Sequence, residues 1–201
     1  MYIITDGGPK ALDLNFTKLV SERSGEEIEA CYQCQKCASG CPIAEYGEMD
    51  TNQVLRMIQF GLKDEILKSK AIWVCVGCET CGARCPNGIR IAAVMDALRE
   101  MAIAEGVAPG EKDIRLFHQC FLDSVKAHGR VHEGTMLMKY KLKSGHLFDD
   151  VGVGLRLFLK GKLALFPHSV PSKTEVRRIF DWAKKKQCGK NGNGFLAEGR
   201  G

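Results

Sequence analysis

This sequence of 201 residues lacks several features that would assign it to a membrane, exported or catalytic class. No apolar run approaches the roughly 20 residues of a membrane-spanning helix, and residues 1–10 show neither the basic nor the apolar region of a secretory signal. It contains no phosphate-binding loop, dinucleotide fingerprint or Ser/His/Asp set. We therefore expect a cytoplasmic protein that neither spans a membrane nor uses Sec export, and that has no catalytic centre of its own.

The charged residues also show no clustering of the kind that binds nucleic acid. Lysine and arginine number 29 against 24 acidic residues, which gives a formal charge of +5, but the basic residues are dispersed and form no recognition motif. With 45% hydrophobic and 26% charged residues, the composition is that of a folded globular protein. We expect no nucleic-acid partner.

Cysteine is the residue that stands out, with ten copies. Without a secretory signal, such a content indicates metal or redox chemistry and not a disulfide framework. Eight copies form two runs with the spacing C-x2-C-x2-C-x3-C-P, namely Cys31, Cys34, Cys37, Cys41 and Pro42, then Cys75, Cys78, Cys81, Cys85 and Pro86. Every position of the second run lies 44 residues after its counterpart, so the runs are an internal duplication.

The duplication continues beyond the cysteines with an offset of 40. It pairs three apolar residues of each half, Val54, Leu55 and Ile58 with Val94, Met95 and Leu98. Each half therefore reads as a cysteine loop followed by an amphipathic helix.

The spacing predicts iron–sulfur chemistry. Three closely spaced thiolates can hold three corners of a [4Fe-4S] cluster, and in two-cluster ferredoxins with this spacing the fourth cysteine ligates the other cluster. We assign Cys31, Cys34, Cys37 and Cys85 to cluster 1, and Cys75, Cys78, Cys81 and Cys41 to cluster 2. An oxidised cluster with four thiolates carries about −2, so two clusters move the formal charge from +5 to about +1. Positive charge at Lys36, Arg84 and Arg90, in or beside the runs, would raise the potentials.

Two other uses of these cysteines are weaker. Structural zinc prefers two cysteine pairs separated by a longer loop, and four cysteines this close together would crowd one tetrahedral ion. A redox dithiol leaves the third and fourth cysteine of each run without a role. Cys120 and Cys188 lie outside the runs and receive no ligand role, and the five histidines share no ligand spacing.

Helical patterns dominate the rest of the chain, so we expect a mainly α protein: an α-helical ferredoxin domain with helical N- and C-terminal extensions. The predicted divisions are a covering segment over 1–25, the ferredoxin domain over 26–106, a helical partner-docking region over 107–188 and a flexible tail over 189–201. Thr51 is the expected N-cap of the helix after the first run, and Asp13 that of the N-terminal helix, which ends at Gly25.

The C-terminal region contains three further patterns. A helix is expected from Glu111 to His128, with Ile114, Phe117, Phe121 and Val125 on its apolar side, and a last helix from the Ser172/Glu175 capping box to about Lys186. Residues 151–166 mix apolar and basic side chains. Such a stretch can lie on a membrane surface, but docking onto another subunit is the favoured interpretation.

Residues 31–42, 53–61 and 73–86 together resemble the C subunit of soluble heterodisulfide reductase. The resemblance implies two [4Fe-4S] clusters that relay electrons, in a hetero-oligomer, from a flavin-containing A subunit, where bifurcation occurs, to a disulfide-reducing B subunit. It thereby implies an oxidoreductase complex of anaerobic metabolism. The iron–sulfur proteins of succinate, fumarate and glycolate oxidoreductases use a similar helical module, but this chain lacks their additional cysteine sets. The alternatives are the iron–sulfur subunit of another, for example quinone-linked, oxidoreductase, and a zinc-stabilised interaction module.

Overall fold

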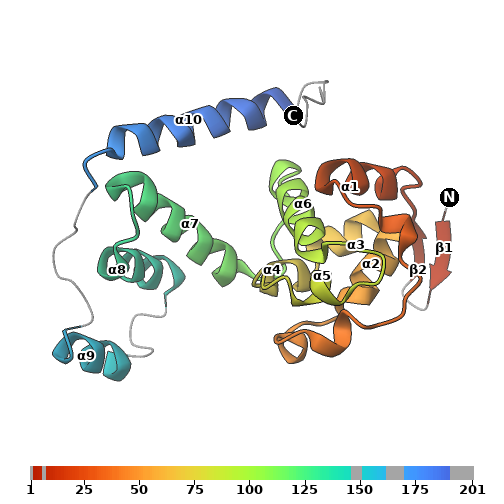
Figure 1. Cartoon of the computed structure of the whole chain (residues 1–201), viewed down its shortest axis with the longest axis horizontal. Coiled ribbons are helices and arrows are strands. Elements are labelled where there is room, and N and C mark those ends of the chain that lie inside the picture. Colours follow the sequence, from red (N-terminus) through yellow and green to blue (C-terminus); the bar gives the residue numbers. More distant parts are fainter. Residues whose placement is uncertain (1, 6–7, 146–150, 162–169, 191–201) are drawn as a thin grey trace. The chain divides into compact units, whose positions relative to one another are not determined.

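The computed structural model describes residues 2–5, 8–145, 151–161 and 170–190. The chain forms two compact units, residues 1–112 and 113–201. The described part is mainly helical, as predicted, with one small two-stranded sheet (Figure 1). No helix in this part of the chain has both the length and the apolar character needed to cross a membrane.

The first unit begins with an antiparallel hairpin that the sequence analysis did not predict. Strand β1 (Tyr2–Thr5) pairs with β2 (Gly8–Ala11), and Ile3 lies opposite Lys10. The sequence held a signal for it, because an Asp-Gly dipeptide at positions 6 and 7 separates the two segments.

Six α-helices and three short 3-10 turns follow within the first unit. Their bounds are α1 (Phe16–Ser24), η1 (Ile28–Ala30), η2 (Ala38–Gly40), η3 (Ala44–Tyr46), α2 (Thr51–Gln59), α3 (Lys63–Lys68), α4 (Ala71–Val74), α5 (Thr80–Arg84) and α6 (Ile91–Ala104). Helix α6 is the central element, because it contacts α1, α3, α4 and α5 (Figure 1). Most of its residues are buried: Ile91, Ala92, Val94, Met95, Ala97, Leu98, Met101 and Ala102. An apolar surface of this breadth suits a helix that neighbours surround.

Helices α2 and α6 confirm the duplication with an offset of 40. They begin at residues 51 and 91, and the three apolar pairs of the sequence analysis are buried in both helices. The predicted N-cap of α2 is wrong by one residue. Asp50 caps the helix and forms a capping box with Gln53, because its carboxylate accepts the Gln53 backbone N–H while Thr51 already has helical geometry.

The N-terminal helix is tied to the end of α2. Asp13 donates its backbone N–H to the Gly61 carbonyl oxygen at 2.8 Å, and the Thr17 hydroxyl donates to the Ile58 carbonyl oxygen at 2.7 Å. The N-cap of α1 is Asn15 and not the predicted Asp13, whose carboxylate instead accepts the Asn15 backbone N–H at 3.0 Å. As predicted, α1 is followed by Gly25, which has a left-handed backbone (φ +72°).

The second unit contains α7 (Lys112–His128) apart from its first residue, followed by α8 (Glu133–Ser144), α9 (Val151–Leu159) and α10 (Lys173–Lys190). The rings of Phe117 and Tyr140 meet edge-on at 5.7 Å between α7 and α8, and Lys126 of α7 pairs with Asp181 of α10 at 3.3 Å. Part of the predicted docking stretch, residues 162–166, and the end of the predicted tail, 191–201, lie outside the described residues.

Two sequence expectations for this unit are corrected. The apolar side predicted for α7 is not its buried one, because Phe117 and Phe121 are 37% and 40% exposed while Cys120 and Ser124 are buried. The small residues face inward, where the Ser124 hydroxyl accepts the His132 backbone N–H at 3.0 Å. Helix α10 runs four residues beyond the predicted end at Lys186, since the Lys- and Gln-rich segment that follows Trp182 favours helix.

Candidate metal-cluster sites

The eight cysteines of the two runs border two separate cavities within the first unit. The first site is the cavity bordered by Cys31, Cys34, Cys37 and Cys85. The second site is the larger cavity, bordered by Cys41, Cys75, Cys78 and Cys81. Each site therefore takes three cysteines from one run and the fourth from the other, which is the grouping that the sequence analysis expects.

The cysteines surround these cavities and do not converge on one point. Among the described residues, no group of three or more His, Cys, Asp or Glu side chains is arranged to hold a single metal ion. Four thiols spaced around a cavity are instead the donor set that suits a polynuclear iron–sulfur group. The residues present therefore fit the two clusters that the sequence predicts.

The backbone of the two cysteine loops, residues 31–41 and 75–85, is duplicated in detail. Gln33 and Gln35 have left-handed backbones (φ +63° for both), and so do their counterparts 44 residues later, Gly77 (+63°) and Glu79 (+60°). Three of these four are not glycine, so each adopts a conformation that side chains disfavour. The same strained turns thus occur between the same cysteines of both loops.

The loops also end alike. The Cys41 N–H donates to the Ala38 carbonyl oxygen and the Cys85 N–H to that of Gly82, both at 3.1 Å. Both cysteines then have extended backbones, with φ/ψ of −74°/119° and −73°/119°. Because a proline follows each, the chain cannot continue as a helix and leaves the loop at its fourth cysteine.

The helix after each loop anchors the first cysteine of that loop. Gln59 at the end of α2 donates its Nε2 to the Cys31 carbonyl oxygen at 3.0 Å. Arg99 of α6 donates its Nη1 to the Cys75 carbonyl oxygen at 3.1 Å. The sequence analysis did not single out either residue, although the offset of 40 relates them to each other.

Apolar residues of the same two helices line the cavities. Leu55 lines the first site and Met95, its counterpart, lines the second. Ile91, which is 1% exposed, lines both. The helix core therefore packs directly against the two sites.

The four thiols differ in exposure in the same order in both loops. Cys37 and Cys81 are buried, whereas Cys34 and Cys78 are exposed. Burial raises the pKa of Cys81 to about 11 and also raises the pKa of Cys75, although Arg99 acts against the latter. The hydrogen bond with Thr80 lowers the pKa of Cys78. Iron binds thiolates, so occupation of the site must release protons from the buried thiols.

In comparison with known proteins, residues 27–89 match the family described as a 4Fe-4S dicluster domain. This part of the chain is a dicluster domain. The chain is similar to the iron–sulfur C subunit of the CoB–CoM heterodisulfide reductase from Methanopyrus kandleri, with 36% identity over 45% of this chain and 47% of that protein. It is also similar to an iron–sulfur C subunit of the CoB–CoM heterodisulfide reductase from Methanocaldococcus jannaschii, with 40% identity over 40% of this chain and 43% of that protein.

A third relative is the C subunit of the H2:CoB–CoM heterodisulfide, ferredoxin reductase of Methanothermobacter thermautotrophicus, with 33% identity over 53% of this chain and 58% of the relative. The chain spans about half the length of the curated relatives it matches. It is an iron–sulfur protein similar to heterodisulfide reductase C subunits, and its dicluster domain binds two [4Fe-4S] clusters.

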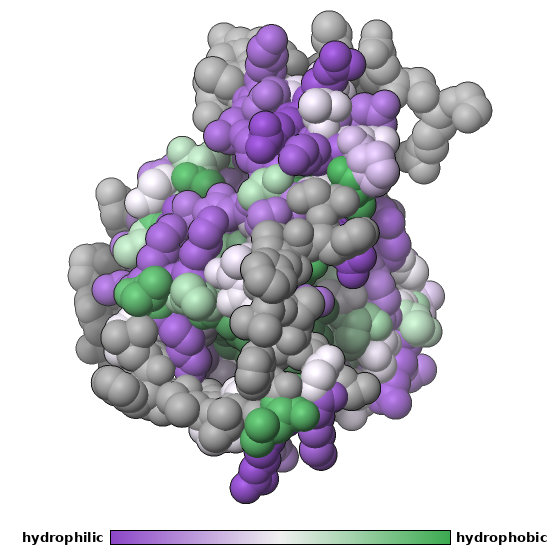
Figure 2. Space-filling model, turned by 90° about the vertical axis from the view of Figure 1, so that its left-hand side faces the viewer, coloured by the Kyte–Doolittle hydropathy of each residue, from purple (hydrophilic) through white to green (hydrophobic). Residues whose placement is uncertain are grey.

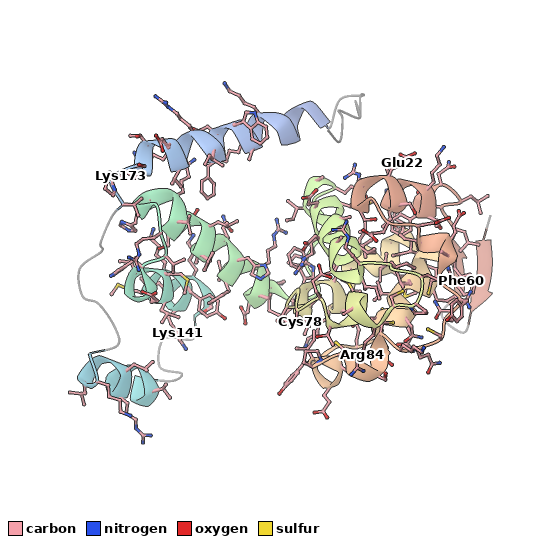
Figure 3. All side chains as sticks on the ribbon, in the orientation of Figure 1. Glu22, Phe60, Cys78, Arg84, Lys141 and Lys173 are labelled. Atoms are coloured by element: carbon pink, nitrogen blue, oxygen red, sulfur yellow. The ribbon has the colours of Figure 1, made fainter. Side chains whose placement is uncertain are left out.

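The three basic residues noted in the sequence occupy different settings in the dicluster domain. Lys36 is exposed on the first loop. Arg84, which is labelled in Figure 3, lies against Gly40, where its guanidinium fills the space that a Cβ would need, so it connects the two loops. Arg90 pairs with the buried carboxylate of Glu26 at 2.7 Å, which compensates its charge.

Cys120, which lies outside the dicluster domain, borders neither cavity. Cys120 is fully buried in α7, as expected for a small apolar side chain. Cys188 lies within α10. Of the histidines, His132 is buried and accepts the Thr135 backbone N–H at its ring Nδ1 (3.2 Å), which is a helix-capping role.

Proposed function

We propose that this protein is the electron-relay subunit of a heterodisulfide reductase-type complex, which passes electrons from a flavin-containing A subunit to a disulfide-reducing B subunit. The observation that carries the proposal is the pair of adjacent cavities, each bordered by four cysteines drawn from both loops. The dicluster match and the similarity to C subunits support it. In this function the protein binds no substrate, so the complex would reduce the disulfide elsewhere.

The proposed ligands are Cys31, Cys34, Cys37 and Cys85 for the first site, and Cys75, Cys78, Cys81 and Cys41 for the second. A bound [4Fe-4S] cluster supplies transfer of one electron at a time. The chain supplies eight thiolates, excludes water with Leu55, Ile91 and Met95, and holds the thiolates with the duplicated loops. Gln33 donates its Nε2 to Cys31 Sγ at 3.4 Å, and such bonds stabilise negative charge on sulfur.

The position of the second cysteine of each loop supports a relay between two partners. Cys34 and Cys78 are both exposed, and each has a large exposed neighbour two residues before it, Tyr32 (62%) and Val76 (65%). Each site thus reaches the protein surface at its own loop. A partner docked on either loop would approach the nearer site through one cysteine side chain.

The second unit offers surface for further contacts in a hetero-oligomer. Leu159 of α9 and Ile179 and Trp182 of α10 are 62% to 75% exposed. On the face seen in Figure 2, hydrophobic groups emerge between hydrophilic ones. Exposed apolar side chains on successive helices are typical of docking surfaces. We infer that this unit holds the relay in its complex, and that docking to protein outweighs membrane binding.

Anaerobic purification of the tagged full-length chain tests the proposal. We expect about eight iron and eight sulfide per chain and copurification of a flavoprotein and a second cysteine-rich protein. Stoichiometric zinc would contradict the cluster sites. If the protein holds eight irons but copurifies with a quinone-linked or other dehydrogenase, the electron-relay role stands and the assignment to a heterodisulfide reductase-type complex is wrong. A variant with Cys120→Ala is the matched control, because this cysteine borders neither cavity and should leave iron and partners unchanged.

A further inference from the structure

The two sites differ in the charge of the side chain that anchors the first cysteine of each loop. Gln59 and Arg99 occupy equivalent positions, 40 residues apart, and each donates to the backbone carbonyl of the first cysteine of its loop. The anchor of the first site is a neutral amide, whereas the anchor of the second site is a guanidinium. The duplication thus provides an internal comparison in which the backbone is the same and the charge is not.

The guanidinium acts from a position shielded from water. The side chain of Arg99 is 14% exposed, while its carboxylate partner Asp96 is 68% exposed. Water screens the exposed carboxylate more than the shielded guanidinium. A net positive charge therefore remains beside the second site.

Other polar groups near the sites do not reproduce this difference. Both sites have side-chain hydrogen bonds that involve sulfur. In the first, Gln33 donates to Cys31 at 3.4 Å and the exposed Tyr32 pairs with Cys34; in the second, the Cys78 thiol donates to Thr80 Oγ1 at 3.4 Å. Lys36 of the first loop and Glu79 of the second would favour the first site, but both are exposed. Exposed charges are weak at a distance because solvent screens them.

In the first half, the cation on α2 contacts the anchoring glutamine and not the carbonyl of Cys31. Arg56 is exposed and donates its Nη1 to Gln59 Oε1 at 3.2 Å, with its guanidinium 5.5 Å from the centre of the Phe60 ring. Gln59 lies between this charge and the Cys31 carbonyl. The first site therefore has no counterpart of the direct Arg99 contact among these groups.

We propose that Arg99 is a tuning residue that makes the second site the one of higher reduction potential, and so sets the direction of electron flow from the first site to the second. The proposal rests on the ligand sets of the proposed function. One electron leaves the reduced first site and reduces the oxidised second site. A positive charge stabilises the more negative, reduced state. The donor then docks at the Tyr32 loop and the acceptor at the Val76 loop.

Redox titration of the full-length, cluster-loaded protein, followed by electron paramagnetic resonance, tests this inference. Two couples are expected. Gln33→Leu removes a hydrogen bond that involves sulfur at the first site, and Thr80→Val removes one at the second. The couple that shifts in each variant is thereby assigned to its site. Arg99→Gln gives the second site the same neutral anchor as the first. We expect it to lower the reduction potential of the second site and to leave that of the first site unchanged. The ratio of reduced to oxidised second site should fall about tenfold, or about 59 mV for a one-electron couple. Arg99→Lys should retain most of the original potential.

Two further variants keep the test decisive. Asp96→Asn removes the carboxylate that opposes Arg99 and should raise the reduction potential of the second site. This variant tests the inference even if the Arg99→Gln protein does not load with clusters. Arg56→Gln is the matched control, and it should shift neither reduction potential by as much as Arg99→Gln shifts that of the second site. The inference is overturned if the second site has the lower potential, if Arg99→Lys shifts it as far as Arg99→Gln does, or if Asp96→Asn leaves it unchanged. None of those outcomes contradicts the proposed function. Fewer than two clusters per wild-type chain would contradict it.

Discussion

At the scale of single residues, the fourth cysteine of each loop distinguishes crossed from uncrossed ligation. We predict that Cys41→Ala damages the cluster of the second site and Cys85→Ala that of the first, because each borders the cavity of the opposite run. Site-resolved spectroscopy of the two variants, with iron-57 labelling, checks this. If each variant instead lost the cluster of its own run, crossed ligation would be wrong.

Crossing has a structural consequence for these residues. The first cluster would connect Cys85 to cysteines 48 to 54 positions earlier, and the second would connect Cys41 to cysteines 34 to 40 positions later. Arg84 already bridges the same two loops through its contact with Gly40. Neither half should therefore fold alone, since each lacks one thiolate for its own site.

At the scale of elements, Gly61 joins the end of α2 to the N-terminal segment and has a left-handed backbone (φ +71°). A Cβ at this position would also overlap the Asp13 carbonyl oxygen. We predict that Gly61→Ala lowers the free energy of unfolding by at least about 2 kcal/mol, from backbone strain and overlap together. Anaerobic guanidinium unfolding of the cluster-loaded protein, followed by circular dichroism, measures this.

Gly25 provides the matched control for Gly61. Its backbone is equally left-handed (φ +72°), but no atom lies within 4 Å of the position a Cβ would take. Gly25→Ala should therefore cost only the strain, about 1 kcal/mol. Equal losses for the two variants would show that the close approach to Asp13 contributes nothing.

The packing of α2 and α6 around the sites leads to a second prediction at this scale. Leu55, Ile91 and Met95 line cavities that the clusters fill, so cluster removal leaves these side chains without their packing partner. The buried thiols would then surround empty space. We expect the chelated, iron-free protein to lose cooperative unfolding. A sharp calorimetric transition with native-like near-ultraviolet circular dichroism in the iron-free form would contradict this.

At the scale of the whole molecule, the two units are expected to have separate tasks. Truncation after Gly145 removes α9 and α10 with their exposed Leu159, Ile179 and Trp182 but leaves every ligand cysteine in place. We predict that the truncated chain retains about eight irons but no longer copurifies with its partners, and that the isolated full-length chain tends to aggregate.

The comparison of partners and membranes completes this test. Stoichiometric copurification of the truncated chain would place docking elsewhere. Stronger binding of the full-length chain to anionic vesicles than to its partners would favour the membrane interpretation of residues 151–166. The substitution Leu159→Glu in the full-length chain should weaken association while leaving iron content unchanged, since that side chain is 75% exposed.

Local patterns in the sequence by themselves determined the duplication and most helices. The offset of 44 between cysteines and of 40 between apolar residues follows from the order of residues alone, and the equivalent turns and the helices α2 and α6 show the same offsets. Helix periodicity and glycine stops are local properties, so they placed the end of α1 and both ends of α7 well. The two [4Fe-4S] clusters were expected for the same reason, because thiol spacing within one loop fixes the chemistry.

Only the tertiary structure decided what depends on distant contacts. The sequence pattern placed Phe117 and Phe121 on the apolar side of α7, but the fold buries the smaller Cys120 and Ser124, and Ser124 accepts the backbone N–H of His132 just before α8. The contact between Arg99 and the Cys75 carbonyl joins residues 24 apart, so no local pattern contains it. The difference between the two sites is therefore visible only once folding has placed equivalent helix positions on equivalent loops.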